Sequence, residues 1–182
     1  FEPDSTLEQL LEELRVLLPG IEAIIVVDDG SRHSSSLAVL DRIRKAGATL
    51  LRHKTNRGKG AALRTGVRHL ADDKAVTQVL TVDADGQHLA RDVAAIEASG
   101  RQTGSFVIGA RAFDGRVPLR SRIGNLISAR VLKFFVGGEL DDTQCGLRAY
   151  PRSWFDLLLG IEFDRYEFEF EALIRILAVG EV

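Results

Sequence analysis

The stretch that decides the fold is Val79–His88, which reads VLTVDADGQH. Its first four residues are apolar or β-branched and predict a strand, and two carboxylates one residue apart, Asp83 and Asp85, follow it. In extended backbone alternate side chains point to the same side, so both carboxylates can reach one cation beyond the strand's carboxyl end. Hard oxygen ligands suit Mg²⁺ or Mn²⁺. The pattern predicts a divalent metal site; the alternative is a solvated acidic turn.

A second apolar run also ends in acids. Ile24–Val27 is followed by Asp28, Asp29 and Gly30. In open α/β sheets ligands bind in the crevice outside the carboxyl ends of the strands, so two strands that end in acids indicate one shared site. One of the two acids could instead cap the next helix or form an Asx turn before Gly30.

Strands and helices alternate along the whole chain. Hydrophobic periodicity predicts helices at 5–18, 36–46, 59–71, 91–99, 121–136 and 153–158, a final helix ending near 179, and strands at 23–27, 49–52, 78–82, 106–109 and 146–150. The segment 166–171 alternates strictly and fits either an edge strand or a lead into the final helix. We expect an α/β fold, a single domain over 1–182, with a mostly parallel central sheet and helices on both faces.

The start of the chain is unusual for such a fold, which should open with a strand. Here Phe1–Asp4 runs straight into the first expected helix, and the chain has no methionine. We therefore expect the first strand to be missing and the chain to be cut at both ends.

Composition narrows the class of protein. The 182 residues carry a formal charge of −2, which fits one globular domain and gives no charge excess for binding nucleic acid. The single cysteine, Cys145, excludes an intrachain disulfide framework, and we expect it to be a small buried residue in a protein of a reducing compartment. No apolar run is long enough to cross a bilayer, and no signal-peptide pattern is present, so the segment is expected to be soluble.

A glycine-rich loop precedes the third expected helix. Asn56–Ala62 reads NRGKGAA, in which two glycines allow close backbone approach, and Lys59 with the free helix N–H groups would favour an anion. It lacks the spacing of a Walker A loop. Contact with phosphate or nucleotide is slightly favoured over a purely structural turn.

Cationic side chains gather after the fourth expected strand. Guanidinium groups bind phosphate bidentately and keep their charge, and Arg111 and Arg122 are the two chosen as phosphate ligands. The cluster as a whole comprises Arg111, Arg116, Arg120, Arg122 and Arg130.

Two further sets of residues bear on the crevice. Asp142 and Gln144 lead into the last expected strand and could reach the crevice, although Asp142 could equally make a local backbone bond. His88 follows the acidic motif and could touch metal-bound phosphate. The remaining histidines lack pairing at ligand spacing and are expected at the surface or in packing: His33, His53 and His69.

Taken together, these motifs resemble family 2 glycosyltransferases of GT-A fold, particularly the polyprenyl-phosphate (dolichol-phosphate) mannosyl- and glucosyltransferases. The motifs appear in that family's order and cover nearly the whole chain: Val27–Ser31, Asn56–Gly60, Val82–His88, Gly109–Arg111 and Asp142–Arg148. The DTQCG run is most similar to the glucosyl-type enzymes.

The resemblance implies a function and its site residues. It implies metal-dependent inverting transfer of a hexose from a UDP-glucose or GDP-mannose type donor. A polyprenyl phosphate acceptor would be seated by Arg111 and Arg122, whereas a saccharide hydroxyl would need Asp142 as base. Residues implied at the nucleotide sugar are Asp28, Asp29, Lys59, Asp83 and Ala84, and those implied at the Mg²⁺ or Mn²⁺ ion are Asp83, Asp85 and Gln87.

The resemblance also implies where the protein works, and the motifs allow alternative functions. A cytoplasmic enzyme, peripheral at the inner face of the membrane where its acceptor would lie, follows from the resemblance; the oligomeric state is not indicated. Alternatives are a glycosyltransferase acting on saccharide hydroxyls in cell-envelope polysaccharide synthesis, a noncatalytic nucleotide-sugar-binding domain, a sugar-phosphate nucleotidyltransferase and, least favoured, a receiver-type signalling module.

Overall fold

The computed structural model describes residues 1–109 and 145–179, in which helices and strands alternate as predicted. The helices are α1 (Ser5–Leu17), α2 (Ser34–Lys45), α3 (Lys59–Ala71), α4 (Ala90–Thr103), α6 (Phe155–Leu159) and α7 (Glu167–Val179). The strands are β1 (Ile25–Asp28), β2 (Thr49–Arg52), β3 (Gln78–Thr81), β4 (Val107–Ile108) and β5 (Arg148–Pro151), and a 3-10 turn, η1 (Arg152–Trp154), joins β5 to α6. The expected helix at 121–136 lies outside the described residues.

Helix α1 illustrates how the sequence produces these elements. Asp4 caps its start, because the Asp4 carboxylate accepts the Thr6 amide at 2.9 Å. Spacings of three and four residues then place four leucines on one face, and all four are buried: Leu7, Leu10, Leu11 and Leu14.

Strand pairing mixes parallel and antiparallel neighbours. β1 and β2 pair in parallel, with Ile25 opposite Thr49 and Asp28 opposite Arg52. β5 lies between β3 and β4 and is antiparallel to both, so β3 and β4 run in the same direction. The α/β class is confirmed; the reversal of β5 was not indicated by the alternation of elements.

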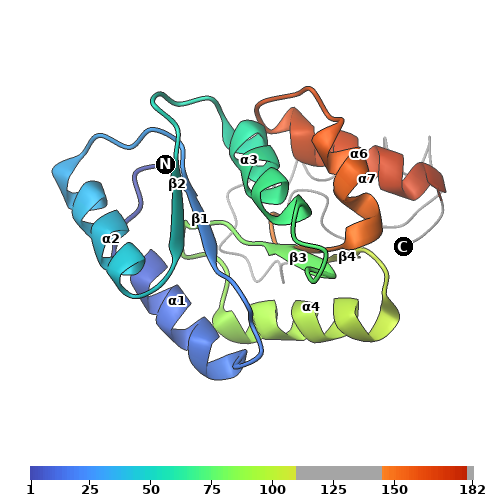
Figure 1. Cartoon of the computed structure of the whole chain (residues 1–182), viewed down its shortest axis with the longest axis horizontal. Helices are drawn as coiled ribbons and strands as arrows, with labels where there is room; N and C mark the ends of the chain where they lie inside the picture. Colours follow the sequence, from blue (N-terminus) through green and yellow to red (C-terminus); the bar gives the residue numbers. More distant parts are fainter. Residues whose placement is uncertain (110–144, 180–182) are drawn as a thin grey trace, which may run out of the picture.

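Helices cover both faces of the strands, as expected (Figure 1). One hydrophobic cluster joins α3, α6 and α7 to one face, and Val79 of β3 packs against it. A second cluster joins α1, α2 and α4 to the other face, and Leu80, the next residue of β3, packs there. This alternation is the two-residue period of a strand that is covered on both sides.

A large cavity runs between β1 and β3, which are not paired with each other among the described residues. Its volume is about 1160 Å³, and Ile25–Val27, Gln78–Thr81 and residues of α1 and α3 line it. Asp29, Lys59 and other polar residues line it where β1 and β3 end. The expected opening strand is not among the described residues and stays a prediction.

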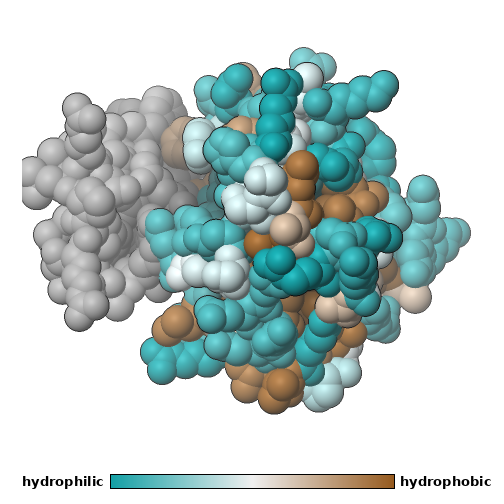
Figure 2. Space-filling view, turned by 90° about the vertical axis from the view of Figure 1, so that its left-hand side faces the viewer, coloured by the Kyte–Doolittle hydropathy of each residue, from teal (hydrophilic) through white to brown (hydrophobic). Residues whose placement is uncertain are grey.

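The surface around α2 is largely hydrophilic, with separate apolar spots (Figure 2). Single exposed apolar side chains, such as Val16 at 79% exposure, are ordinary for a globular protein. Within the described ranges no helix is both long and apolar enough to span a bilayer.

Candidate functional site

Asp28, the last residue of β1, is buried and hydrogen-bonded to other protein groups. Its carboxylate is buried and accepts the Ser31 amide at 3.0 Å and Nε of Arg52 at 2.8 Å. Burial opposes ionisation, but these bonds hold the pKa of Asp28 below its usual value. The local turn considered for one of the two acids is therefore what Asp28 forms.

Asp29 ties β1 to the glycine-rich loop. Its Oδ1 accepts the Arg57 amide at 2.9 Å, its Oδ2 accepts the Gly58 amide at 2.8 Å, and Nδ1 of His53 lies 2.6 Å from Oδ1. Burial opposes ionisation, yet the bonds from His53 and the two amides hold the pKa of Asp29 below its usual value. Asp29 also lines the cavity, so it both shapes the loop and borders the crevice.

His53 is a packing residue, one of the two positions expected for it, and it has specific partners. The imidazole lies between Asp29 and the Thr65 hydroxyl, 3.0 Å from Nε2, and only 7% of its side chain is exposed. Local spacing did not indicate these partners, because Asp29 and His53 follow neighbouring strands and meet only through the β1–β2 pairing. His33 and His69 are exposed, as predicted.

The glycines of the loop face protein. Gly58 has φ +107°, and a Cβ on it would meet the Asp164 carbonyl. A Cβ on Gly60 would lie 2.5 Å from Cβ of Phe168. The Ala61 amide at the start of α3 donates to the Asp164 carbonyl at 2.9 Å. These contacts support the structural-turn interpretation of the glycines and leave Lys59 as the loop's candidate ligand.

Lys59 bridges two carboxylates from different parts of the chain. Its Nζ lies 2.6 Å from Oδ1 of Asp83 and 2.7 Å from Oε2 of Glu169 in α7. Burial opposes the charged form, but Glu169 and Asp83 hold the pKa of Lys59 above its usual value. Sequence reasoning missed Glu169. The available signal was an acid within the apolar pattern of α7, where Phe168 and Ala172 are buried.

Asp83 lies two residues beyond the end of β3, in contact with three parts of the chain. Besides Lys59, Nε2 of the buried His88 is 3.9 Å from its Oδ2, and a Cβ on Gly146 would clash with the carboxylate. Burial raises the pKa of Asp83, but His88 and Lys59 outweigh it and lower the pKa to about 2. Asp83 is therefore ionised at neutral pH.

The rest of the acidic motif forms an exposed turn. Residues 84–86 are not extended, and Gly86 has φ +74°. The Gln87 amide donates to Oδ1 of Asp85 at 3.0 Å. Asp83 and Asp85 both line the cavity, as does Ala84. The extended geometry assumed for the two acids is not what the backbone adopts.

Two carboxylates fit a divalent ion that takes the rest of its shell elsewhere. Among residues 1–109 and 145–179, no three His, Cys, Asp or Glu side chains gather as metal ligands. Mg²⁺ commonly binds through one or two carboxylates plus water and substrate phosphates, and Asp83 and Asp85 supply that set. The donor chemistry therefore fits, while an all-protein metal cage among these residues does not.

Several expected site residues lie outside the described residues. Cys145 is described and is 2% exposed within the hydrophobic core, as predicted. The expected site residues that lie outside the described residues, all within 110–144, are Arg111, Arg116, Arg120, Arg122, Arg130, Asp142 and Gln144.

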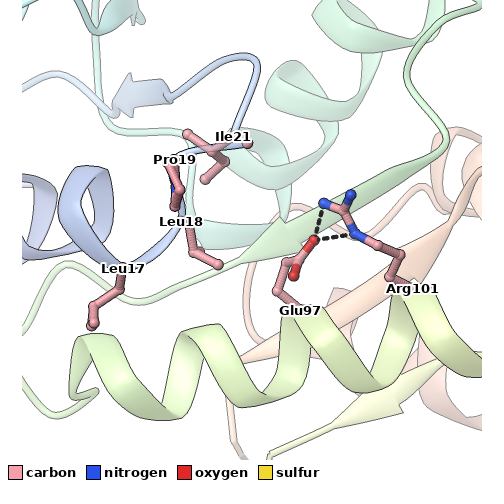
Figure 3. A pocket seen from close by; sticks show the side chains of 7 residues that line it. Leu17, Leu18, Pro19, Ile21, Glu97 and Arg101 are labelled. Atoms are coloured by element: carbon pink, nitrogen blue, oxygen red, sulfur yellow. Dashed lines mark hydrogen bonds and ion pairs between the residues drawn. The ribbon is translucent and has the colours of Figure 1, made fainter.

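A second, smaller pocket lies away from the motifs, between the end of α1 and α4 (Figure 3). It measures about 240 Å³, and its lining includes Leu17, Pro19, Glu97 and Arg101. The two charged side chains neutralise each other, with Arg101 Nε 2.7 Å from Glu97 Oε1. The motif residues line the larger cavity instead, so that cavity is the candidate active site.

The fold and the order of the motifs at this cavity define a glycosyltransferase of the GT-A class. The chain belongs to glycosyl transferase family 2, whose family model matches residues 2–159. In structure it resembles glucosyl-3-phosphoglycerate synthase from Mycobacterium tuberculosis, solved with phosphoglyceric acid, with a TM-score of 0.68 and 20% identity over 98% of this chain and 64% of that one. That likeness concerns the fold.

Curated relatives include enzymes named for lipid phosphate acceptors. An uncharacterised protein of Methanocaldococcus jannaschii is 34% identical over 93% of this chain and 68% of its own length. UDP-N-acetylglucosamine–dolichyl-phosphate N-acetylglucosaminyltransferase of Methanococcus voltae is 31% identical over 87% and 72%. A dolichyl-phosphate β-glucosyltransferase of Trichomonas vaginalis is 30% identical over 71% of this chain, which spans 41% of that enzyme.

Proposed function

We propose that the protein transfers a hexose, with inversion, from a nucleotide sugar to a polyprenyl phosphate in a metal-dependent reaction. The observation that carries the proposal is the Lys59–Asp83 ion pair where β3 ends, beside the exposed Asp85 and within one cavity. The relatives named for dolichyl phosphate support the acceptor class. A cytoplasmic enzyme working at the inner face of a membrane is part of the proposal.

The donor would bind with its diphosphate at the acidic motif. Asp83 and Asp85 would hold a divalent ion, with Gln87 beside it, and the ion would act as a Lewis acid on the leaving diphosphate. Lys59 would place a positive charge next to the same oxygens. Asp29 and Ala84 would border the nucleotide sugar, since both line the cavity. Asp28, buried at the end of β1, would support that border through the Ser31 turn.

The acceptor determines whether a base is needed. A polyprenyl phosphate already carries negative oxygen at neutral pH, so it needs a cationic seat, for which we propose Arg111 and Arg122. A saccharide hydroxyl must lose a proton during attack, and Asp142 would then be the base. Transfer to a saccharide in cell-envelope polysaccharide synthesis is the second candidate function.

Calorimetry with UDP-glucose, UDP-N-acetylglucosamine and GDP-mannose, with Mn²⁺ and with chelator, tests donor binding. We expect one donor to bind only with Mn²⁺, and Asp85→Ala to weaken that binding at least about tenfold without lowering the melting temperature, because Asp85 is exposed. Metal-independent binding would refute the assigned ion site, and binding without transfer to any acceptor would identify a noncatalytic domain.

A transfer assay distinguishes the acceptors. Labelled hexose should pass to a short polyprenyl phosphate in detergent, and the product should keep its single phosphate. Efficient transfer to a soluble saccharide in the absence of lipid would overturn the lipid phosphate proposal and favour the second candidate.

A further inference from the structure

Glu169 is a buried acid that the assigned chemistry does not use. It lies in the first turn of α7 and is 7% exposed, and its Oε2 is 2.7 Å from Nζ of Lys59. Its other oxygen, Oε1, is buried and has no hydrogen-bond partner within the described ranges. A buried carboxylate with one unpaired oxygen is costly, so its position needs a physical reason.

A favourable position in the helix dipole does not explain the burial. Carboxylates stabilise the first turn of a helix, but Glu167 of α7 supplies the same charge from an exposed position. Glu169 has two cationic neighbours: the buried Arg148, which donates to the Glu169 carbonyl at 2.7 Å, and Lys59, whose side chain joins that of Glu169 between the start of α7 and the start of α3 at the cavity. The ammonium is thus held from two sides, by Asp83 and by Glu169.

We infer that Glu169 is the positioning residue for Lys59, which it keeps at the cavity when Asp83 binds a divalent ion. This inference rests on the proposed function. An ion at Asp83 would compete with Lys59 for the same carboxylate, and a lysine left without an anchor would regain the freedom of its four-carbon stem. Lys59 has three N–H donors, so one can remain on Glu169 while the others reach diphosphate oxygens.

The alternative, a purely electrostatic effect of Glu169, makes the opposite prediction. A negative charge beside the cavity repels an anionic ligand, so removing that charge should strengthen diphosphate binding. If Glu169 positions Lys59, removing the charge should weaken binding. The sign of the change therefore separates the two.

Calorimetry with inorganic pyrophosphate and Mg²⁺ tests the inference without assuming a donor base. The proteins are the unsubstituted chain, Glu169→Gln, Lys59→Gln, the double variant, and Glu167→Gln as the matched control. We expect Glu169→Gln to bind at least about tenfold more weakly, the scale of one charge-assisted hydrogen bond. The double variant should bind no more weakly than Lys59→Gln alone, and Glu167→Gln should bind at least as tightly as the unsubstituted chain.

Each outcome decides between the proposals. Unchanged or tighter binding by Glu169→Gln, or additive effects in the double variant, would overturn the role of Glu169 while the proposed function stands. No pyrophosphate binding by the unsubstituted chain would overturn both. If Glu169→Gln does not fold, Glu169→Asp decides instead: it keeps the charge but withdraws the carboxylate by one methylene, so weaker binding supports positioning and equal binding refutes it.

Discussion

Replacing Asp29 by asparagine should destabilise the fold even without ligand. The Asp29 carboxylate is 4% exposed and accepts the Arg57 and Gly58 amides at 2.9 and 2.8 Å. Asparagine keeps one acceptor oxygen, so it can satisfy one amide, and its NH₂ group then faces the other. Losing one charge-assisted bond and leaving one buried N–H unpaired costs about 2–4 kcal/mol. For a chain of this size that is a fall of about 5–12 °C in melting temperature.

Urea unfolding at pH 7, followed by fluorescence, measures this cost. Trp154 is the only tryptophan and is buried, so its emission reports on the core. The control is Asp41→Asn, which removes a carboxylate whose side chain is 44% exposed and paired with Arg44 and Lys45, and should cost less than about 1 kcal/mol. Equal stability of the two variants would refute the argument that Asp29 holds the loop.

Three further predictions concern the same region. The pKa of Asp29 is lower in the fold than in the unfolded chain, where it is about 3.9, so its contribution to the free energy of unfolding is complete above that pH and is lost as pH falls through the folded value. Urea midpoints measured at intervals of about one pH unit should fall between pH 5 and pH 3, and they should fall less steeply in Asp29→Asn. Gly60→Ala should cost about 1–3 kcal/mol in urea unfolding, because its Cβ would lie 2.5 Å from that of Phe168, whereas Gly66→Ala, 3.5 Å from Val27, should be neutral or stabilising; similar losses in both would contradict the packing argument. Gly146→Ala should displace the Asp83 carboxylate and weaken Mg²⁺-dependent pyrophosphate binding at least about tenfold, and unchanged binding in calorimetry would separate Asp83 from the ion site.

Local pattern was enough to predict most elements. β2 and α3 begin and end where the periodicity placed them, at 49–52 and 59–71. The segment 166–171, which fits strand or helix, is helical from Glu167, because Phe168, Ala172 and Leu173 pack together only at helical spacing. The direction of β5 was not predictable, since no local pattern distinguishes a parallel from an antiparallel buried strand.

One part of the candidate site could be predicted from the sequence: the side chains that the direction of the strands alone brings together. Acids at the ends of β1 and β3 line one cavity with Lys59, as the shared direction of α/β strands indicates. The contacts of Asp29 with His53 and of Lys59 with Glu169 depend instead on tertiary packing. Such long-range partners have no signature in local spacing, so the sequence predicted which residues line the cavity but not what holds them in place.

The segment that packs over the glycine-rich loop, which includes Ile161, Phe163 and Phe168, determines when that loop can adopt its final structure. Arg64 of α3 donates to the carbonyls of Ile161 and Phe163, 97 and 99 residues further along the chain. Closing a loop of that length costs about 4 kcal/mol of chain entropy. At ordinary rates of synthesis about 5–20 s separate the emergence of these segments from the ribosome. The strand pair β1–β2 can form early, but the loop around Lys59 takes its final shape only after α7 has docked, because Phe168 and Glu169 of α7 contact it.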